Sequence, residues 1–568
     1  MSFILDFSID KIIFSGGQTL NLSKKDKILI VGPNNSGKSQ SIRDIVSILS
    51  EHDGNPVVIT ELKTNKNFNK ADLEDYLKIY ARFKDGSYHI GAAKVHNSHV
   101  LTFSGKEKIY SLSNLFIKQI NAKDRLSICD TQKSIDLTEI KTVPQHVLYD
   151  NSKLMDKVSD IFKKAFNKDL AFDFRAGNKI PIHLVDKKEL AHIPDRVSDE
   201  YIEKLRKFPQ LDRQGDGIKS YAGILFETIA HNYAVTMIDE PEAFLHPPQM
   251  RRLGQTLSEE VSGQLLVATH SSDILRGFLE GTKGDLKVIR IRRDNNTNFI
   301  HELDHEVIKE LWSKPNLRYS NALEAIFHEQ VVICEDDSDC RFFNFIADYL
   351  TNEKKFIFPD TCYVPTGGKH AIAGVAKALR LSGVPVKAIF DFDLISEKNT
   401  LIKTLEAFGC SGHDLDSIMK LWDTINSEVT QKSKKITNAE LKEMLTSLII
   451  NTPEDKISKN KIDDIFNQKK PWSDTKAHGI NGLPKGNIRK TFQKFNGKLK
   501  ELGIFLIPVG EVENFSAETG LHGPAFVEKF LSDRNVEEED LKPLRDFVQE
   551  VYSSKITHQI CETTESVT

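Results

Sequence analysis

The sequence lacks several features that would assign it to a common class. No apolar stretch approaches the ~20 residues that a membrane-spanning helix needs. No two of the six cysteines have CxxC spacing, and no histidine stands at zinc-ligand spacing from one of them. The start, MSFILDFSID, lacks the basic region and long apolar run of a signal peptide. We therefore expect a cytoplasmic protein with reduced thiols and no membrane contact.

An excess of positive charge is also missing. The chain has 77 Lys and Arg against 81 Asp and Glu, a formal net charge of −4. A protein that binds nucleic acid through its whole surface is usually basic. Any contact with nucleic acid must therefore come from a local patch or through metal ions.

The length of 568 residues exceeds what one hydrophobic core supports, and polar sequence before residue 320 indicates a domain boundary there. We expect a first domain over 1–320, with an insertion at about 57–209. We expect a second domain over 321–568, with a basic helical insertion at about 396–500. In the second domain, apolar strand patterns alternate with helix patterns, which predicts an α/β fold with a parallel sheet.

A phosphate-binding motif stands near the start of the chain. GPNNSGKS at 32–39 matches GxxxxGK[ST], follows the apolar strand pattern 28–31 and precedes a helix pattern. The glycines let backbone N–H groups and a helix N-terminus surround phosphate. A chance glycine turn is the alternative, which the flanking patterns argue against. We expect ATP to contact Gly32, Asn34, Asn35, Ser36, Gly37, Lys38 and Ser39, with Mg²⁺ on Ser39.

Two further strand patterns end in polar residues. Asp239 and Glu240 end the pattern 234–238, where an aspartate typically holds Mg²⁺ and a neighbouring glutamate orients the attacking water. His270 ends the pattern 265–269; such a histidine alone is more often structural. Gly215, Asp216 and Gly217 form a turn just before the Asp239 strand, and a plain helix-start turn is its alternative reading.

The order of these motifs over residues 1 to about 300 resembles the ABC/SMC-like ATPases. That resemblance implies that His270 contacts the γ-phosphate. It implies that Gly215 and Gly217 belong to a signature loop closing over ATP bound to the partner subunit. It also implies a head-to-head homodimer with two ATP molecules between the subunits.

Acidic residues follow the strand patterns of the second domain. Since the carboxyl ends of parallel strands form sites in α/β sheets, we expect these side chains to converge. Converging carboxylates need a cation, and oxygen ligands suit Mg²⁺ or Mn²⁺. An ordinary strand-end or cap role is the alternative, equally weighted for Asp339 and for Glu511. The expected ligands are Glu335, Asp339, Asp391, Asp393, Glu511 and Glu513.

Glu335, the glycine-containing PTGGKH at 365–370 and the DxD of Asp391 and Asp393 resemble the Toprim domain, although Asp336 stands where Toprim proteins usually have glycine. An ABC-type ATPase followed by a Toprim domain resembles the OLD (overcoming lysogenization defect) family of nucleases. The resemblance implies catalytic roles for Glu335, Asp391 and Asp393. It also implies a nearby catalytic lysine, for which Lys369 and Lys529 remain open.

A basic stretch lies between the DxD and the last strand pattern, so we expect it near the metal-binding edge. It could hold a DNA backbone through counterion release, or be a solvated helical face. Trp472, Phe492 and Phe495 are interleaved with it. Its cations are Lys461, Lys469, Lys470, Lys476, Lys485, Arg489, Lys490, Lys494, Lys498 and Lys500.

Together these motifs predict an ATP-binding, Mg²⁺- or Mn²⁺-dependent DNA endonuclease controlled by an ATPase dimer. The resemblance implies anti-phage defence with a partner, either a protein or a retron reverse transcriptase with its nucleic acid. One alternative is an ATP-gated nucleic-acid sensor or scaffold that does not cut. Another is a DNA-repair or topoisomerase-like ATPase, although no tyrosine stands in a recognisable nucleophile setting.

Overall fold

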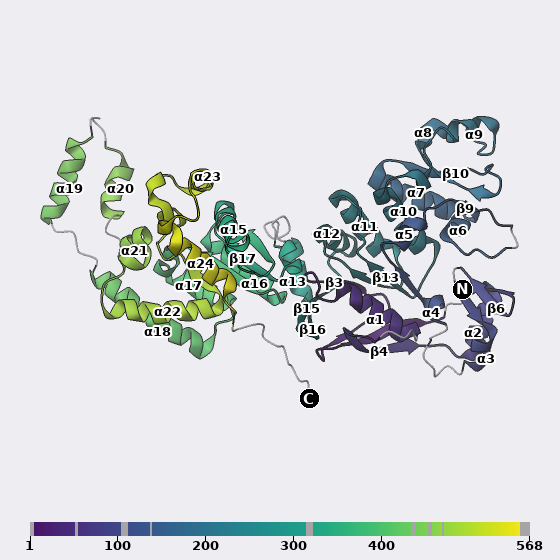
Figure 1. Cartoon of the computed structure of the whole chain (residues 1–568), viewed down its shortest axis with the longest axis horizontal. Coiled ribbons are helices and arrows are strands. Elements are labelled where there is room, and N and C mark those ends of the chain that lie inside the picture. The colour runs from purple at the N-terminus through teal and green to yellow at the C-terminus, as the bar shows by residue number, and fades with distance from the viewer. Residues whose placement is uncertain are drawn as a thin grey trace. The chain divides into compact units, whose positions relative to one another are not determined.

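The computed structural model has a mixed α/β architecture in two compact units, Met1–Trp312 and Ser313–Thr568 (Figure 1). It describes residues 5–50, 55–91, 93–103, 109, 112–136, 139–313, 322–432, 438–452, 457–467 and 471–556. The expected boundary at residue 320 lies outside these ranges. None of the described helices is long and apolar enough to cross a membrane.

A six-stranded sheet organises the first unit, with strand order β16-β15-β3-β14-β13-β8. The strands from β15 to β8 run parallel, and β16 returns antiparallel to β15. Three of the six lie where apolar runs predict strands, so those predictions are confirmed. The bounds are β3 Lys27–Val31, β8 Ile117–Ile120, β13 Val235–Asp239, β14 Gln264–Ala268, β15 Lys287–Asp294 and β16 Thr297–Glu302.

Helices accompany this sheet, and smaller sheets surround it. The longer helices are α1 Lys38–Ser50, α2 Lys70–Tyr80, α7 Ser152–Phe166, α10 Asp216–Ala230, α11 Pro247–Glu260, α12 Ser272–Thr282 and α13 His305–Ser313. The shorter helices are α3 Asn97–Thr102, α4 Ser113–Phe116, α5 Asp124–Ser127, α6 Pro144–Asp150, α8 Lys187–Leu190 and α9 Asp199–Leu205. The remaining strands are β1 Phe7–Phe14, β2 Thr19–Asn21, β4 Ile59–Lys66, β5 Arg82–Lys84, β6 Ser87–Ile90, β7 Ala93–His96, β9 Gln132–Lys133, β10 Asp169–Phe172, β11 Lys179–Ile180 and β12 Ile182–Val185.

The range 57–209 is not one insertion, which corrects the sequence-based expectation. β4 pairs with β1, and β8 forms an edge of the central sheet beside β13. These strands escaped detection because β4 is mostly exposed and β8 has only four residues. Within this range, β5 and β6 form a hairpin around Asp85–Gly86, and α7 is an amphipathic helix.

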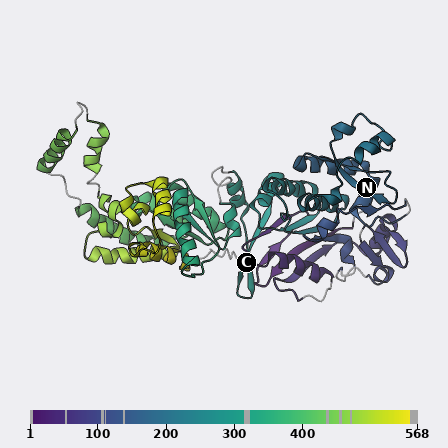
Figure 2. The ribbon, with the colours of Figure 1, turned by 45° about the horizontal axis from the view of Figure 1, so that its top comes forward.

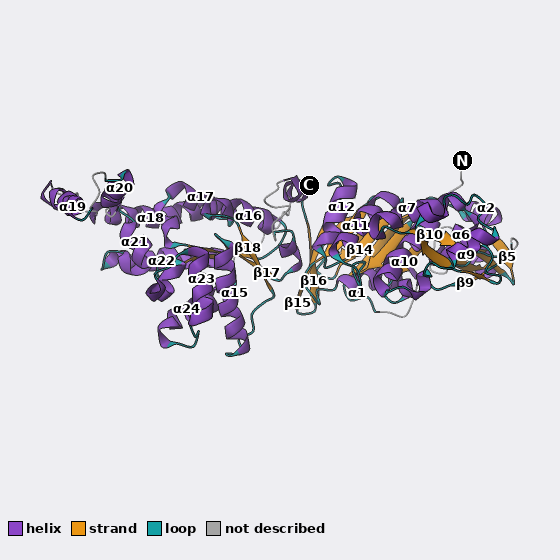
Figure 3. Cartoon of the chain, turned by 90° about the horizontal axis from the view of Figure 1, so that it is seen from above, coloured by secondary structure: helices purple, strands orange, loops and turns teal. Residues whose placement is uncertain are grey.

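The second unit contains a four-stranded parallel sheet in the order β18-β17-β19-β20, which confirms the parallel arrangement. Helices cover both faces, with α16 on one side and α15, α23 and α24 on the other (Figure 3). A phenylalanine-rich core joins the latter three helices to the sheet. The bounds are β17 Gln330–Cys334, β18 Thr361–Pro365, β19 Val386–Phe390, β20 Ile504–Leu506, α15 Asp337–Asn352, α16 Lys369–Leu381, α23 Gly523–Asp533 and α24 Lys542–Ser553.

The segment between β19 and β20 is helical, as its sequence predicts. Its helices α18 and α22 pack side by side, and α19 packs against α20 (Figure 2). The bounds are α17 Lys398–Ala407, α18 Gly412–Lys432, α19 Asn438–Ile450, α20 Lys459–Asn467, α21 Ser473–His478 and α22 Asn487–Leu502.

Candidate functional site

The phosphate loop connects β3 to α1, as its motif requires. Gly32 has a φ of 139° and Gly37 a φ of 103°, a backbone region that favours glycine. A Cβ at Gly32 would lie 2.3 Å from the carbonyl oxygen of Ile291, and one at Gly37 would lie 2.8 Å from Nδ2 of Asn298. Gly32 is therefore needed for close packing against the backbone of β15, and Gly37 for the close approach of the Asn298 side chain.

The Lys38 side chain has two polar partners within the loop. Lys38 Nζ donates to the carbonyl oxygens of Gly32, at 2.8 Å, and Pro33, at 2.9 Å. Burial lowers the pKa of Lys38, while nearby Glu242, Glu240 and Asp239 oppose that change. The ammonium group is thus held inside the loop, where a phosphate would lie.

Asp239 ends β13 and hydrogen-bonds the side chain of Ser39, so the structure brings the two expected Mg²⁺ ligands of this site together. Burial raises the pKa of Asp239. Its Oδ1 is buried and has no hydrogen-bond partner among the described residues. An unpartnered buried carboxylate oxygen beside a hydroxyl fits a divalent cation.

Glu240 and His270 follow neighbouring strands. The N–H of Glu240 donates to the carbonyl oxygen of Ala268 at 2.9 Å, which ties the end of β13 to β14. His270 Nδ1 lies 3.0 Å from Oε1 of Glu242 and is half exposed. Glu242 also accepts from the His270 N–H at 2.8 Å and from Thr269 Oγ1 at 2.9 Å. Burial raises the pKa of this carboxyl group.

Three residues that sequence reasoning missed support this site. Glu242 orients His270. Asn298 on β16 is buried, and its Nδ2 donates to the carbonyl oxygen of Ser36 at 2.6 Å. Arg125 on α5 is fully buried, and its Nη2 donates to the carbonyl oxygen of Glu240 at 2.9 Å. Only Glu242 had a local signal, its place in the motif IDEPEAF; the other two come from distant elements without a motif.

The expected signature loop lies at the start of α10, with Gly215 as the N-cap. A Cβ at Gly217 would lie 2.6 Å from the carbonyl oxygen of Phe244. The loop borders a cavity of about 230 Å³ that Phe244 and His246 also line. Its described neighbours thus belong to the segment after β13, and the phosphate loop is not among the residues lining this cavity.

In the second unit, Glu335 follows β17 directly, and Asp391 follows β19. The backbone N–H of Asp391 donates to the Glu335 carboxylate. The carbonyl oxygen of Glu335 accepts from the N–H groups of Gly367, at 2.8 Å, and Gly368, at 3.0 Å. These bonds join the ends of β17 and β19 and the glycine loop at one edge of the sheet.

The acidic groups at this edge are close enough to disfavour each other's ionisation. Burial and then Glu335, Asp339 and Glu511 raise the pKa of Asp391 to about 9. Burial and then Asp393 raise the pKa of Glu335 to about 7. Burial, joined by Asp336 and Glu513, raises the pKa of Asp339 to about 6. Such a cluster favours a bound cation, which would relieve the repulsion.

The fit to a metal ion is incomplete in its geometry. Glu335 Oε1 and Asp393 Oδ1 are buried and lack hydrogen-bond partners among the described residues, which suits a cation. However, no three His, Cys, Asp or Glu side chains of the described chain stand together in a metal-holding arrangement. The carboxylates are therefore close enough to affect each other's pKa, but they would have to move closer together to bind one ion.

Of the two candidate lysines, Lys369 lies with the acids. Its Nζ is 2.8 Å from Asp393 Oδ2 and 2.8 Å from Glu397 Oε1. Burial acts to lower the pKa of Lys369, but these two hydrogen bonds outweigh it and raise the pKa. Glu397 was not predicted from sequence, and Lys529 is exposed on α23.

The two later glutamates have different surroundings. Glu511 Oε1 lies 3.1 Å from Nζ of Lys476, whose pKa this hydrogen bond raises. Glu513 Oε1 accepts the N–H of Gly523 at 2.7 Å, which places it at the start of α23. Both remain near enough to affect Asp391 and Asp339, respectively.

The basic stretch does not gather at the carboxylate edge, which corrects that expectation. Lys476 contacts Glu511 there, but Lys500 pairs with Glu550 at 2.5 Å on α24. The cause is topological. α22 leads into the amino end of β20, whereas the acids follow the carboxyl ends of the strands. Phe492 and Phe495 are buried core residues. Lys469 and Lys470 lie outside the described residues.

Residues 28–276 match the family model described as "AAA domain, putative AbiEii toxin, Type IV TA system". No curated protein matches the chain. Among solved structures, the Smc head bound to the C-winged helix domain of ScpA is 13% identical, covering 52% of this chain and 98% of that chain, with a TM-score of 0.34. The SMC head domain from Thermotoga maritima is 13% identical, covering 53% and 99%, with a TM-score of 0.28.

A nucleotide-free ATP-binding cassette from an ABC transporter is 14% identical, covering 56% of this chain and 98% of that chain, with a TM-score of 0.24. At these scores the likenesses carry no conclusion about activity or partners. The family match and the loop geometry agree on the same residues, since Lys38, Ser39 and Asp239 all lie within 28–276. The first unit therefore contains an ATP-binding P-loop ATPase domain.

Proposed function

We propose that this chain is an ATP-controlled, metal-dependent DNA endonuclease whose cutting site is the carboxylate cluster of the second unit. The observation that carries the proposal is the group of Glu335, Asp391 and Asp393, partly buried at one sheet edge, with the pKa of Asp391 raised to about 9. With this pKa, Asp391 holds its proton at neutral pH unless a cation replaces it.

Within this cluster, Glu335, Asp391 and Asp393 would hold Mg²⁺ or Mn²⁺ once their carboxylates move closer together, with Asp339, Glu511 and Glu513 as neighbouring carboxylates. A metal ion held there would supply charge stabilisation for cleavage of a phosphodiester. Lys369 orients Asp393 through its hydrogen bond and adds a positive charge beside the scissile phosphate.

The ATPase domain would control this site. Lys38 would bind the β- and γ-phosphates, Ser39 and Asp239 would hold Mg²⁺, and Glu240 would orient the attacking water. Two chains would associate through ATP, with Gly215 and Gly217 of each chain facing the nucleotide of the other. DNA is the substrate in this proposal, and the cellular setting is anti-phage defence with a partner protein or a retron reverse transcriptase with its nucleic acid.

The test is nicking of supercoiled plasmid in Mg²⁺ or Mn²⁺, with and without ATP. Asp391→Asn should reduce nicking at least a hundredfold, because it removes a metal-holding charge without changing shape. Asp546→Asn, an exposed change on α24, is the matched control and should cut normally. Lys38→Ala should abolish the effect of ATP. Cutting that survives Asp391→Asn would exclude the carboxylate cluster as the active site.

A second candidate is an ATP-gated nucleic-acid sensor that does not cut. It is favoured by the ion pairs of Lys369 with Asp393 and Glu397, which neutralise part of the cluster without a metal. In that case the wild-type protein would bind DNA and respond to ATP, yet leave plasmid intact in both metals.

A further inference from the structure

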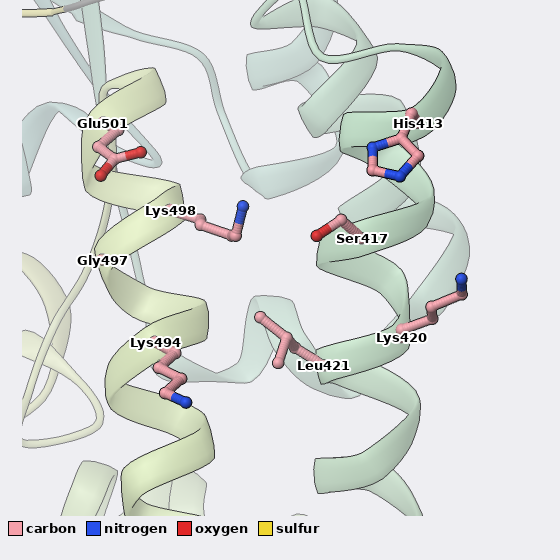
Figure 4. A pocket seen from close by; sticks show the side chains of 8 residues that line it. All are labelled: His413, Ser417, Lys420, Leu421, Lys494, Gly497, Lys498 and Glu501. Atoms are coloured by element: carbon pink, nitrogen blue, oxygen red, sulfur yellow. The ribbon is translucent and has the colours of Figure 1, made fainter.

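A groove runs between α18 and α22 in the helical segment of the second unit. Its cavity volume is about 680 Å³, and its lining includes His413, Ser417 and Lys420 from α18. The facing side contributes Lys494 and Lys498 from α22. Figure 4 shows the two helices running in opposite directions on either side of this space.

Positive charge dominates the groove. Lys498 and Ser417 point into the space between the helices, whereas Lys420 points away from it at the rim (Figure 4). Lys494 and Lys498 stand one helical turn apart and form no ion pair with an acidic residue in the described part of the chain. Glu501 is the one acid that lines the groove. Unpaired lysines around a hollow favour an anionic occupant.

Gly497 lies between these two lysines on α22 and keeps the hollow open. Glycine within a helix is unfavourable compared with other residues, so it normally has a packing reason. Here a Cβ would meet no atom within 4 Å, so no close backbone contact requires the glycine. The open space at Gly497 belongs to the groove itself.

The groove is separate from the carboxylate cluster. α22 ends at Leu502, and β20 begins at Ile504, whereas Glu511 and Glu513 follow the far end of that strand. The Glu501 end of the groove therefore lies toward the sheet edge opposite the acids. A ligand here would be held without being exposed to the cutting chemistry.

We propose that this groove binds the phosphate backbone of a single DNA strand, as a second anchor for the nucleic acid. Lys494 and Lys498 contact successive phosphates, Ser417 donates a hydrogen bond, and Gly497 gives the strand room to pass. The inference rests on the proposed function only in taking DNA as the ligand.

The test is fluorescence anisotropy of labelled oligothymidylate with the full chain in EDTA, over a range of salt concentrations. Lys494→Gln with Lys498→Gln should weaken binding about tenfold and reduce the slope of log K against log salt by about 1.4. Gly497→Leu should weaken binding through obstruction, and leucine suits a helix better than glycine, so the fold should not suffer. The matched control is Lys377→Gln with Lys403→Gln, two exposed lysines on α16 and α17.

Equal losses in the groove and control pairs would overturn the proposal, as would tight binding by Gly497→Leu. A competition arm uses inorganic tripolyphosphate. If tripolyphosphate displaces the strand from wild type at equal phosphate concentration and fails to bind Gly497→Leu, the groove binds compact polyphosphates. The strand assignment would then be wrong. EDTA prevents cutting, so strand binding is measured independently of nuclease activity. If the chain binds the strand in EDTA but does not nick plasmid in Mg²⁺ or Mn²⁺, the proposed function is wrong and the groove assignment still holds.

Discussion

At the scale of single residues, side chains without a motif hold the recognisable ones in place. Asn298 supports the phosphate loop through the Ser36 carbonyl, and Glu242 orients His270. Arg125 donates to the carbonyl oxygens of Glu240 and Ala243 and so fixes the backbone after β13. Each is buried, so loss of its hydrogen bonds leaves a polar group of the site without a partner.

Asn298→Ala should weaken ATP binding. The change removes the donor to the Ser36 carbonyl and frees the loop, a loss of about 1–1.5 kcal/mol, or roughly tenfold in Kd. Titration with a fluorescent ATP analogue measures it. Asn296→Ala, an exposed change at the turn of the same hairpin, is the control. Equal affinities for wild type and Asn298→Ala would show that the loop does not depend on this bond.

Lys387 gives the second unit a dependence on pH. It is buried in β19, and its Nζ donates to the carbonyl oxygens of Val551 and Tyr552 at the end of α24. Burial lowers its pKa from 10.5 to about 8. The unfolded chain therefore binds the proton more tightly than the folded chain. The loss of folding stability that this causes is full below pH 8 and disappears as pH rises toward 10.5.

Thermal unfolding of wild type and Lys387→Met at pH 7.5 and 9.5 tests this prediction. The melting temperature of wild type relative to the variant should rise by about 2–6 °C between the two pH values, corresponding to about 1–2 kcal/mol. Lys377→Met, at an exposed site, should show no such change. If the melting temperature of wild type relative to Lys387→Met stays constant or falls between pH 7.5 and 9.5, the lowered pKa is wrong.

At the scale of elements, the glycine loop before α16 positions the carboxylate edge. Gly367 and Gly368 have φ values of 75° and 126°, and both donate to the Glu335 carbonyl. Gly368 is also the N-cap of α16, whose first residue is Lys369. One short loop thus sets the positions of Glu335 and of the lysine that reaches Asp393.

Gly368→Ala should destabilise the second unit by about 1–3 kcal/mol, because its φ of 126° and ψ of 155° are accessible almost only to glycine. Gly374→Ala lies in the middle of the same helix with open space around it, and should be stabilising by up to about 1 kcal/mol. Opposite shifts of melting temperature are expected. The same sign for both changes would contradict the strained loop.

At the scale of the whole molecule, one chain contains an ATPase domain and a separate α/β unit with its own sheet and core. The proposed dimer would complete each ATP site with the Gly215–Gly217 loop of the other chain. Communication between ATP and the carboxylate cluster would then depend on the assembly.

Glu240→Gln should trap ATP and shift the chain to a dimer in light scattering with ATP and Mg²⁺, since it slows hydrolysis without removing the Mg²⁺ ligand Asp239. The double variant Lys38→Ala with Glu240→Gln should show the same mass with ATP as without it. If ATP leaves the mass of the Glu240→Gln chain unchanged, the ATP-driven dimer is wrong.

The sequence by itself determined the features that local pattern encodes. Apolar runs and their polar ends located β3, β13 and β14 in one unit and β17 to β20 in the other, together with the motif at Gly32–Ser39. These depend on residues within a few positions of each other, which periodicity and spacing reveal. Edge strands such as β8 escaped because they are short and half-buried.

Tertiary structure decided which distant residues meet. Asn298 reaches Ser36 across 262 positions because β15 pairs with β3 and carries β16 beside the loop. Lys369 reaches Asp393 because β18, β17 and β19 are successive neighbours in the sheet, whereas Lys529 lies on the exposed face of α23. The basic stretch was divided for the same reason, since the direction of α22 follows from the strand it precedes. Strand order is a property of the whole chain, so no local pattern contains it.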